Sequence, residues 1–250
     1  MEPAEALADC LRGVAETLRH HRDLGFREIT LSRDPFSEPP VSDPAFPDPS
    51  FSDPSLSDPS CSDPVEALRV QEQARAGCKL CKLCKSRSTI VFGVGNPRAR
   101  LMVVGEGPGE EEDKQGIPFV GRAGQLLNSM LRAAGFERGE VYIANVLKSR
   151  PPNNRDPAAD ETDHCLPYLR RQIELVDPAV ILCVGRIAAQ RLLEREEPLA
   201  RLRGRIHRLG RTPVIVTYHP AYLLRSPTEK RKSWDDIKLA LGVLADGDRA

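Results

Sequence analysis

Four short apolar runs, separated by longer helical stretches, constrain the fold of this chain more than any other feature. The runs are rich in β-branched residues and occupy positions 101–105, 141–147, 179–185 and 214–218. Strands that are buried on both faces have this continuous apolar composition. Stretches with a helical spacing of apolar residues cover 121–134, 159–175, 186–194 and 233–244. Strands that alternate with helices predict an α/β fold, with a parallel sheet between two layers of helices.

The first 64 residues differ in composition from the rest of the chain. Residues 1–30 have helical spacing, and between positions 43 and 64 the dipeptide Asp-Pro recurs every five residues. Proline lacks a backbone N–H and restricts the residue before it, so we expect a disordered linker at 31–64. The folded domain then spans 65–250. The acidic N-terminal part is either a solvated tether or a docking arm for a protein partner.

Charge is unevenly distributed along a chain in which 36 Lys and Arg balance 36 Asp and Glu. Residues 1–64 carry a net charge of −8 and residues 65–250 a net charge of +8. A basic domain behind an acidic leader indicates a polyanionic partner for the domain. The chain has no run of 18 apolar residues and no secretory signal pattern, so we expect a cytoplasmic protein without a membrane partner.

Polar, loop-forming segments follow three of the four predicted strands, at 106–113, 148–155 and 219–221. The carboxyl ends of parallel strands meet at one edge of a sheet, where ligands bind in this fold class. We therefore expect the three segments to form one site. The first segment is rich in glycine but lacks Gly-Lys-Ser/Thr, so it is not a nucleotide-binding P-loop.

Three side chains near these segments have both a structural and a functional interpretation. Phe119, flanked by glycines and a proline, either packs in the core or stacks on a planar ligand. Asn145, inside an apolar strand, either bonds to the backbone or reads the edge of a base. His219, at a strand end, either caps a helix or polarises a developing oxyanion.

The cysteines indicate a metal centre rather than disulfides, because the chain has no secretory signal. Cys78, Cys81 and Cys84 are each separated by two residues, and Cys165 is a candidate partner far along the chain. Four thiolates suit zinc or an iron–sulfur cluster. Cys183 lies in a predicted strand and is expected to be a small buried hydrophobic residue.

Three motifs carry a family resemblance: VFGVGNPRARLMVVGEGPGEEEDKQGIPFVGRAGQLL, NVLKSRPPNNRDP and YHPAYLLR. Together they resemble the type-4 uracil-DNA glycosylases, the iron–sulfur-containing bacterial and archaeal branch, over roughly residues 77–244. The resemblance implies a three-layer α/β/α sandwich with a four-stranded parallel sheet. It also implies a monofunctional, monomeric enzyme that flips uracil out of DNA and hydrolyses its N-glycosidic bond.

The resemblance also implies roles for individual residues. His219 stabilises the uracil anion as it leaves, Asn154 positions the attacking water, and Glu106 is a further catalytic acidic position.

Four residues are expected to bind the base itself. Phe119 stacks on uracil and Asn145 reads its Watson–Crick edge. Gly107 belongs to the loop that lines the pocket, and Glu112 guards the C5 side against the methyl group of thymine.

The expected cofactor is a 4Fe-4S cluster held by four cysteines. Three family positions match Cys78, Cys81 and Cys165, whereas the remaining one falls at Ser149. We predict that Cys84 supplies the missing thiolate. The alternatives are ligation by Ser149, a cluster with three cysteines, or no cluster.

Contacts with DNA are expected around the mouth of the site. Arg150, Arg155 and Arg225 are predicted to contact phosphates, as are Lys148, Lys230, Arg231 and Lys232. Leu223 and Leu224 either wedge into the base stack or pack under the sheet edge. The N-terminal segment is a candidate docking site for a repair or replication protein.

Two other functions remain open. One is a glycosylase of the same fold for hypoxanthine or xanthine, and the other is a module that binds DNA lesions without turnover. Covalent trapping of the abasic sugar is not expected, because the segment 150–156 has neither an insertion nor a histidine.

Overall fold

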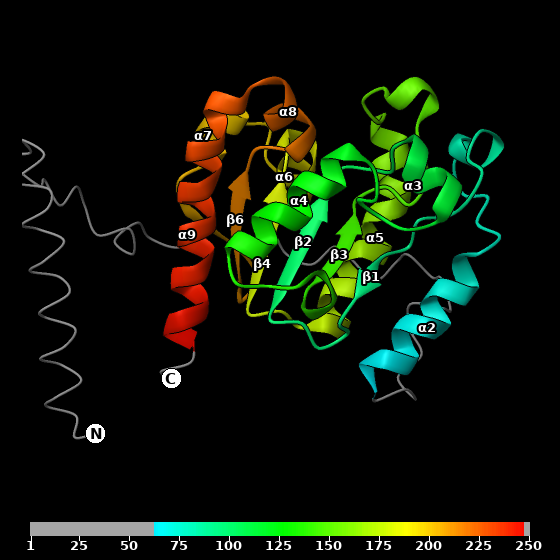
Figure 1. The fold of residues 1–250 in the computed structure, drawn as a ribbon. Helices are drawn as coiled ribbons and strands as arrows, with labels where there is room; N and C mark the ends of the chain where they lie inside the picture. Colours follow the sequence, from blue (N-terminus) through cyan, green and yellow to red (C-terminus); the bar gives the residue numbers. More distant parts are fainter. Residues whose placement is uncertain (1–62, 248–250) are drawn as a thin grey trace, which may run out of the picture. The chain divides into compact units, whose positions relative to one another are not determined.

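The computed structural model describes residues 63–247, which contain one six-stranded sheet in the order β1-β3-β2-β4-β6-β5 (Figure 1). The four central strands are parallel, as the apolar runs predicted. They are β2 (Leu101–Gly105), β3 (Tyr142–Asn145), β4 (Val180–Val184) and β6 (Thr212–Thr217). Their carboxyl ends therefore share one edge of the sheet.

Two antiparallel edge strands extend the sheet, so the prediction of four strands was wrong in number. They are β1 (Val94–Gly95), paired with β3, and β5 (Ile206–Leu209), paired with β6. Neither has the continuous apolar composition of a central strand. β1 has two residues and an exposed Val94, while β5 alternates in burial and carries His207 and Arg208. Short or amphipathic edge strands leave a weak signal in a sequence.

Helices cover both faces of the sheet, which confirms the three-layer arrangement (Figure 1). α4 (Arg122–Ala133) and α9 (Lys230–Gly247) pack on one face, and α5 (Ala159–Val176) and α6 (Arg186–Leu193) on the other. Alternate residues of β2 enter the two cores, with Val103 in one and Val104 in the other. Cys183 is fully buried in β4, where it packs as a hydrophobic residue.

The described chain begins with the last Asp-Pro pair of the repeat. Pro64 is the first residue of α2 (Pro64–Arg75), and the side chain of Asp63 caps the helix by accepting from Val65 N at 3.3 Å. The first described helix therefore begins inside the range predicted to be linker, at Pro64. The remainder of the predicted helix at 1–30 and linker at 31–64 lies outside the described residues. None of the helices between 63 and 247 is long and apolar enough to cross a bilayer.

The remaining elements are short and lie in the connections. They are α3 (Glu110–Gln115), α7 (Leu199–Leu202), α8 (Pro220–Arg225), and the 3₁₀ helices η2 (Lys82–Lys85), η3 (Arg138–Glu140), η4 (Pro152–Asn154) and η5 (Pro227–Glu229).

Candidate active site

Four residues meet at the carboxyl ends of the parallel strands: Gly105, Phe119, Asn145 and His219, which we call the strand-end site. Gly105 ends β2 and lies opposite Asn145 of β3. A Cβ atom on Gly105 would lie 2.4 Å from Asn145 Oδ1 and 2.6 Å from Phe119 Cζ. The rings of Phe119 and His219 have centroids 5.7 Å apart. Only glycine at position 105 lets the amide and the aromatic ring approach this closely.

Asn145 presents an unused hydrogen-bond acceptor within this site. The residue is 1% exposed, and among the described residues its Oδ1 has no hydrogen-bond partner. A buried polar atom without a partner costs about 1–3 kcal/mol. A ligand that donates a hydrogen bond to Oδ1 would recover this energy, and the base-reading role of Asn145 stays a prediction.

Phe119 is held in an unfavourable backbone conformation. Its φ is 53°, in the left-handed region, and its side chain is 5% exposed. Arg138 stabilises this conformation, because its Nη1 donates to Phe119 O at 3.1 Å and its Nη2 donates to Pro118 O at 2.5 Å. Gly124 allows the fit, since a Cβ there would lie 1.9 Å from Phe119 O. The surrounding chain therefore fixes the ring at a cost of about 1–3 kcal/mol.

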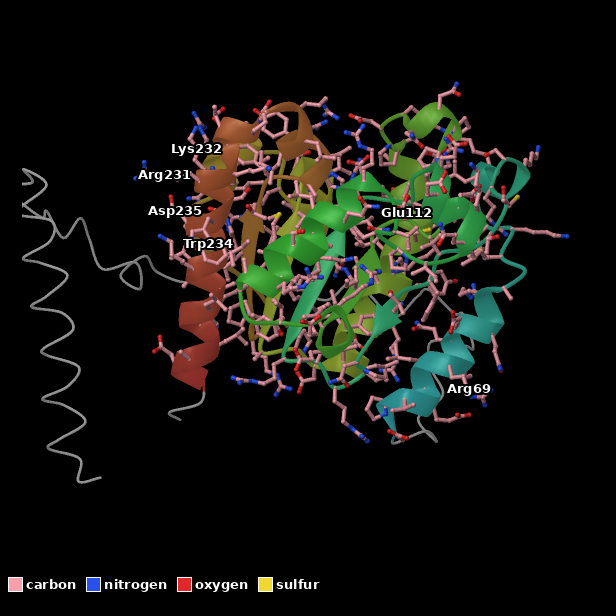
Figure 2. All side chains as sticks on the ribbon, in the orientation of Figure 1. Arg69, Glu112, Arg231, Lys232, Trp234 and Asp235 are labelled. Carbon is pink, nitrogen blue, oxygen red and sulfur yellow. The ribbon has the colours of Figure 1, made fainter. Side chains whose placement is uncertain are left out.

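Glu112, on α3 (Figure 2), connects two loops of the site. Its Oε1 accepts hydrogen bonds from Val120 N and Gly121 N, both at 2.9 Å. Its Oε2 faces the glycine loop, because a Cβ on Gly109 would lie 2.6 Å from that atom. The carboxylate therefore holds the segment that carries Phe119, and its role at the C5 side of the base stays a prediction.

The environment of His219 favours a neutral imidazole that can donate a hydrogen bond. It is the N-cap residue of α8, and its Nδ1 accepts a hydrogen bond from Ala221 N at 3.1 Å. Partial burial, together with the positive charge of Arg225, lowers the pKa of His219 to about 4. The imidazole is therefore neutral at pH 7, and since Nδ1 is an acceptor, the proton lies on Nε2.

Glu106 follows β2 directly and titrates near neutrality. Partial burial and the nearby negative charge of Asp156 raise its pKa to about 7, whereas the charge of Arg186 opposes the shift. Arg186 Nη2 donates to Asp156 Oδ2 at 2.9 Å. Gly107, the next residue, packs on Leu147, since a Cβ there would lie 3.3 Å from Leu147 Cβ. A carboxylate with this pKa can act as a general base at physiological pH.

Asn154 lies on the exposed η4 segment with a φ of 53°. Its Oδ1 accepts a hydrogen bond from Arg150 Nε at 2.8 Å. The structure thus places it in the loop that also carries Asp156, the neighbour of Glu106.

The predicted DNA contacts divide into exposed and internal groups. Leu223 is 0% exposed and packs inside the domain, so the wedge interpretation is wrong for this residue. Leu224 is 37% exposed, so the wedge interpretation stays open for this residue. Lys148 is 4% exposed, so its predicted phosphate contact is also wrong. The exposed basic groups include Arg225, Lys230, Arg231 and Lys232, the last two labelled on α9 in Figure 2.

Two of the predicted phosphate-binding arginines have partners within the protein. Arg155 donates to the buried carboxylate of Glu161 at 2.8 and 2.6 Å, and this interaction holds the pKa of Glu161 at about 2. Arg150 bonds to Asn154 and lies 3.7 Å from Glu110. Both arginines order the loop after β3, so any contact with phosphate would compete with these bonds.

A second group of side chains forms the cysteine pocket, whose lining includes Cys78, Cys81, Ser149, His164 and Cys165. Cys84, in the same described range, is not part of this lining. Burial raises the pKa of Cys165 to about 11 and also raises the pKa of Cys81. Within residues 63–247, no three His, Cys, Asp or Glu side chains are grouped to hold a single metal ion.

Lys148 connects the cysteine pocket to the strand-end site. It precedes Ser149 and lines the pocket, while its Nζ donates to Asn145 O at 2.8 Å and to Gln172 Oε1 at 2.6 Å. Lys148 was predicted to contact DNA, and Arg138 was not predicted to take part in the site. The apolar run that precedes Lys148 is consistent with its burial. Arg138 lies in a short 3₁₀ helix, whose sequence has no pattern that indicates a role in the site.

Several known proteins are similar to this chain. A family model described as the Uracil DNA glycosylase superfamily matches residues 92–238. The type-4 uracil-DNA glycosylase of Archaeoglobus fulgidus is 45% identical over 169 residues, covering 64% of this chain and 85% of that protein. The type-4 enzyme of Thermotoga maritima is 43% identical over 179 residues, covering 70% and 93%. That of Sulfurisphaera tokodaii is 41% identical over 183 residues, covering 70% and 83%.

Proposed function

The chain belongs to the uracil-DNA glycosylase superfamily and to its type-4 branch, and from this premise we propose that it excises uracil from DNA, leaving an abasic site. The observation that carries the proposal is the buried Asn145 Oδ1, which has no partner among residues 63–247 and lies beside a fixed aromatic ring and a neutral histidine. These groups match the three needs of the reaction, which are to read the base, hold it and stabilise it as it leaves.

Recognition of uracil requires a donor and an acceptor on one side chain. The N3–H of uracil would donate to Asn145 Oδ1, and the amide nitrogen of Asn145 would donate to O4. Cytosine has a bare N3 and an amino group at position 4, so it would leave both polar groups of the amide unpaired. A site built to hydrogen-bond its substrate rejects such an analogue strongly. The base reaches these groups only when its nucleotide flips out of the stack, where Phe119 can stack on it.

Departure of the base leaves negative charge on uracil as the bond between N1 and the sugar C1′ breaks. The Nε2–H of His219 would donate to uracil O2, where that charge accumulates. A neutral imidazole donates without giving up its proton, so uracil leaves as an anion. One such preorganised donor is worth about 10²- to 10³-fold in rate.

Attack by water completes the hydrolysis. A water oxygen forms the new bond to C1′ and passes a proton to the carboxylate of Glu106, whose pKa of about 7 suits a general base at neutral pH. Asn154 would orient this water, as the family resemblance implies. Glu112 would reject thymine, whose C5 methyl group approaches the carboxylate that holds the Phe119 loop.

Binding to DNA would use the exposed basic residues near the site, including Arg225, Lys230, Arg231 and Lys232. Leu224 is the remaining candidate for a side chain that enters the vacated stack. The protein would act as a cytoplasmic monomer on the nucleoid, with residues 1–64 available to a repair or replication partner.

The cysteine pocket fits a 4Fe-4S cluster better than a single zinc ion. Three thiols face one space, but no three of the potential ligand side chains in the described chain are grouped around a single ion. The ligands of a cluster bind different iron atoms and therefore stand further apart. Cys78, Cys81 and Cys165 would hold the cluster, which would supply cross-linking between distant segments rather than a chemical step.

A substrate panel tests the proposed function. Oligonucleotides with a single uracil, thymine, cytosine, hypoxanthine or xanthine, single-stranded and in duplex, are incubated with the protein and then cleaved with alkali. We expect strand breaks at uracil alone. Breaks at hypoxanthine or xanthine instead would favour the alternative base preference, and tight binding to uracil-containing DNA without breaks would favour a lesion-binding module.

A further inference from the structure

The cysteine pocket has a serine where a fourth thiol is expected. Ser149 is 4% exposed and lines the pocket together with Cys78, Cys81 and Cys165. We propose that the Oγ atom of Ser149, and not the thiol of Cys84, is the fourth ligand of the cluster. This inference rests on the proposed cofactor but not on the proposed reaction.

The hydroxyl of Ser149 is already held in place at the pocket. Arg87 Nη1 donates to Ser149 Oγ at 3.3 Å, and Arg87 Nη2 donates to Cys78 O. One guanidinium thus connects the serine to the segment that carries the first cysteine. On the other side, Lys148 O accepts from Val91 N at 2.9 Å, which fixes the backbone next to Ser149. The positive charge of Arg87 also offsets part of the negative charge that thiolate ligands would bring to the pocket.

Cys84 does not line the pocket, although it lies three residues from Cys81, which does. Its N–H donates to Cys81 O at 3.2 Å, within the first turn of η2. The preceding residue, Leu83, is 1% exposed and packs against Leu147 and Cys165. Among the described residues that line the pocket, only Cys78, Cys81 and Cys165 are cysteines.

A serine ligand has a chemical consequence. Iron–sulfur clusters prefer soft thiolates, and an oxygen ligand is harder. The iron atom at the Ser149 corner is therefore expected to be the first that a chelator removes. Replacing Ser149 with cysteine supplies a thiolate at the same position and is expected to slow the release of that iron.

The test compares Ser149→Cys, Ser149→Ala and Cys84→Ala with the full-length wild-type chain. Each protein is purified without oxygen and enriched in ⁵⁷Fe. Iron and sulfide are measured per chain, one iron site is identified by Mössbauer spectroscopy, and iron release to a chelator is timed. We expect one oxygen-ligated iron in the wild type, and release roughly 10- to 100-fold slower in Ser149→Cys, the range that substitutions beside metal ligands produce. Ser149→Ala should lose one iron, and Cys84→Ala should match the wild type.

Loss of iron in Cys84→Ala, or a wild-type spectrum in Ser149→Ala, would overturn the proposal. Iron bound by Ser149→Cys but by no other protein would overturn it as well, because the serine would then not be a ligand. Iron in none of the four proteins would contradict the cofactor itself. Uracil excision measured in the same samples reports separately on the proposed function.

Discussion

The strand-end site and the cysteine pocket are built in different ways within one domain. The strand-end site lies where β2, β3 and β6 end, and its side chains are fixed by close glycine contacts and by hydrogen bonds to loop backbone. The cysteine pocket combines residues of a loop (positions 78 and 81), of the segment that follows β3 (position 149) and of α5 (position 165). Next to it, Leu83 and Leu147 pack against Cys81 and Cys165.

Because of this difference, we expect changes in one region to affect mainly the rate of excision, and changes in the other to affect mainly the stability of the fold. In the strand-end site, Asn145 Oδ1 has no hydrogen-bond partner among the described residues and Phe119 has a positive φ. Changes there should lower the rate of excision and leave the fold intact. Changes in the cysteine pocket should lower stability first, and reach the rate only through Lys148.

The largest effect is expected from Asn145→Ala. The variant would leave uracil N3–H and O4 unpaired, at about 1–3 kcal/mol each, so kcat/KM should fall by roughly 10²- to 10³-fold. Excision kinetics measure this loss and thermal unfolding checks the fold. Asn96→Ala, at an exposed asparagine distant in sequence from the site, is the matched control and should keep full activity. Equal activity of both variants would remove Asn145 from base reading.

Arg138→Ala should have the next largest effect. Without the guanidinium, the peptide of Phe119 can leave its left-handed conformation, and a displaced ring should lower kcat by about 10- to 100-fold. If Arg138 only stabilised the fold, its removal would lower Tm and leave kcat unchanged, so both Tm and kcat are measured. Arg132→Ala on α4, with a side chain 68% exposed, is the control. Partial rescue by Arg138→Lys would support positioning, and unchanged kcat in Arg138→Ala would contradict it.

The pH profile should report the ionisation of Glu106. Its pKa of about 7 means that the carboxylate, the form that accepts a proton, increases as the pH rises through 7. His219, with a pKa of about 4, stays neutral throughout. We expect kcat/KM to rise about tenfold between about pH 6 and pH 8, and Glu106→Gln to abolish the rise. If the rise in kcat/KM persisted in Glu106→Gln, another ionising group would be responsible for it. Glu110→Gln is the control and should keep the rise.

Adjacent leucines on α8 should respond in opposite ways. Leu224→Ala removes an exposed side chain, and should slow excision from duplex DNA about 3- to 10-fold while sparing single strands. Leu223→Ala opens a cavity and should lower the free energy of unfolding by about 2–5 kcal/mol. Chemical denaturation and excision assays on both substrates distinguish the two. A duplex defect in Leu223→Ala alone, at matched folded fractions, would reverse the assignment.

The smallest effect on rate is expected from Cys165→Ala. The cysteine is 8% exposed in the pocket, and its loss should lower stability by at least about 1 kcal/mol, a few degrees in Tm. The folded fraction should keep kcat within about threefold, because the strand-end site does not need this thiol for its geometry. A loss of kcat as large as that of Asn145→Ala would show that the two regions do not act separately.

Sequence predicted the strand-end site better than the cysteine pocket for a physical reason. Parallel strands bring their carboxyl ends together. The segments that follow three apolar runs could therefore be assigned to one edge of the sheet from the sequence alone. No such rule relates Cys78 to Ser149 and Cys165. The spacing of the cysteines favoured Cys84, which is not among the residues that line the pocket.

Other residues escaped prediction because their roles depend on packing. Residues 223 and 224 are both leucine, so the sequence does not distinguish them. The packing of α8 buries Leu223 and leaves Leu224 exposed. Arg138 acts through the backbone carbonyls of Pro118 and Phe119, and carbonyl contacts leave no trace in a sequence. The edge strands were missed because pairing with β3 and β6, rather than apolar composition, defines them.

The most direct test of the central claim is a single-turnover measurement of uracil release by the wild type and by His219→Ala. The labelled duplex carries one uracil opposite guanine, and DNA affinity is measured in parallel. The strand-end account predicts complete excision by the wild type and a rate about 10²- to 10³-fold lower in the variant, with DNA affinity unchanged. A folded wild-type protein that releases no uracil, or a His219→Ala variant that releases it at the wild-type rate, would contradict the account.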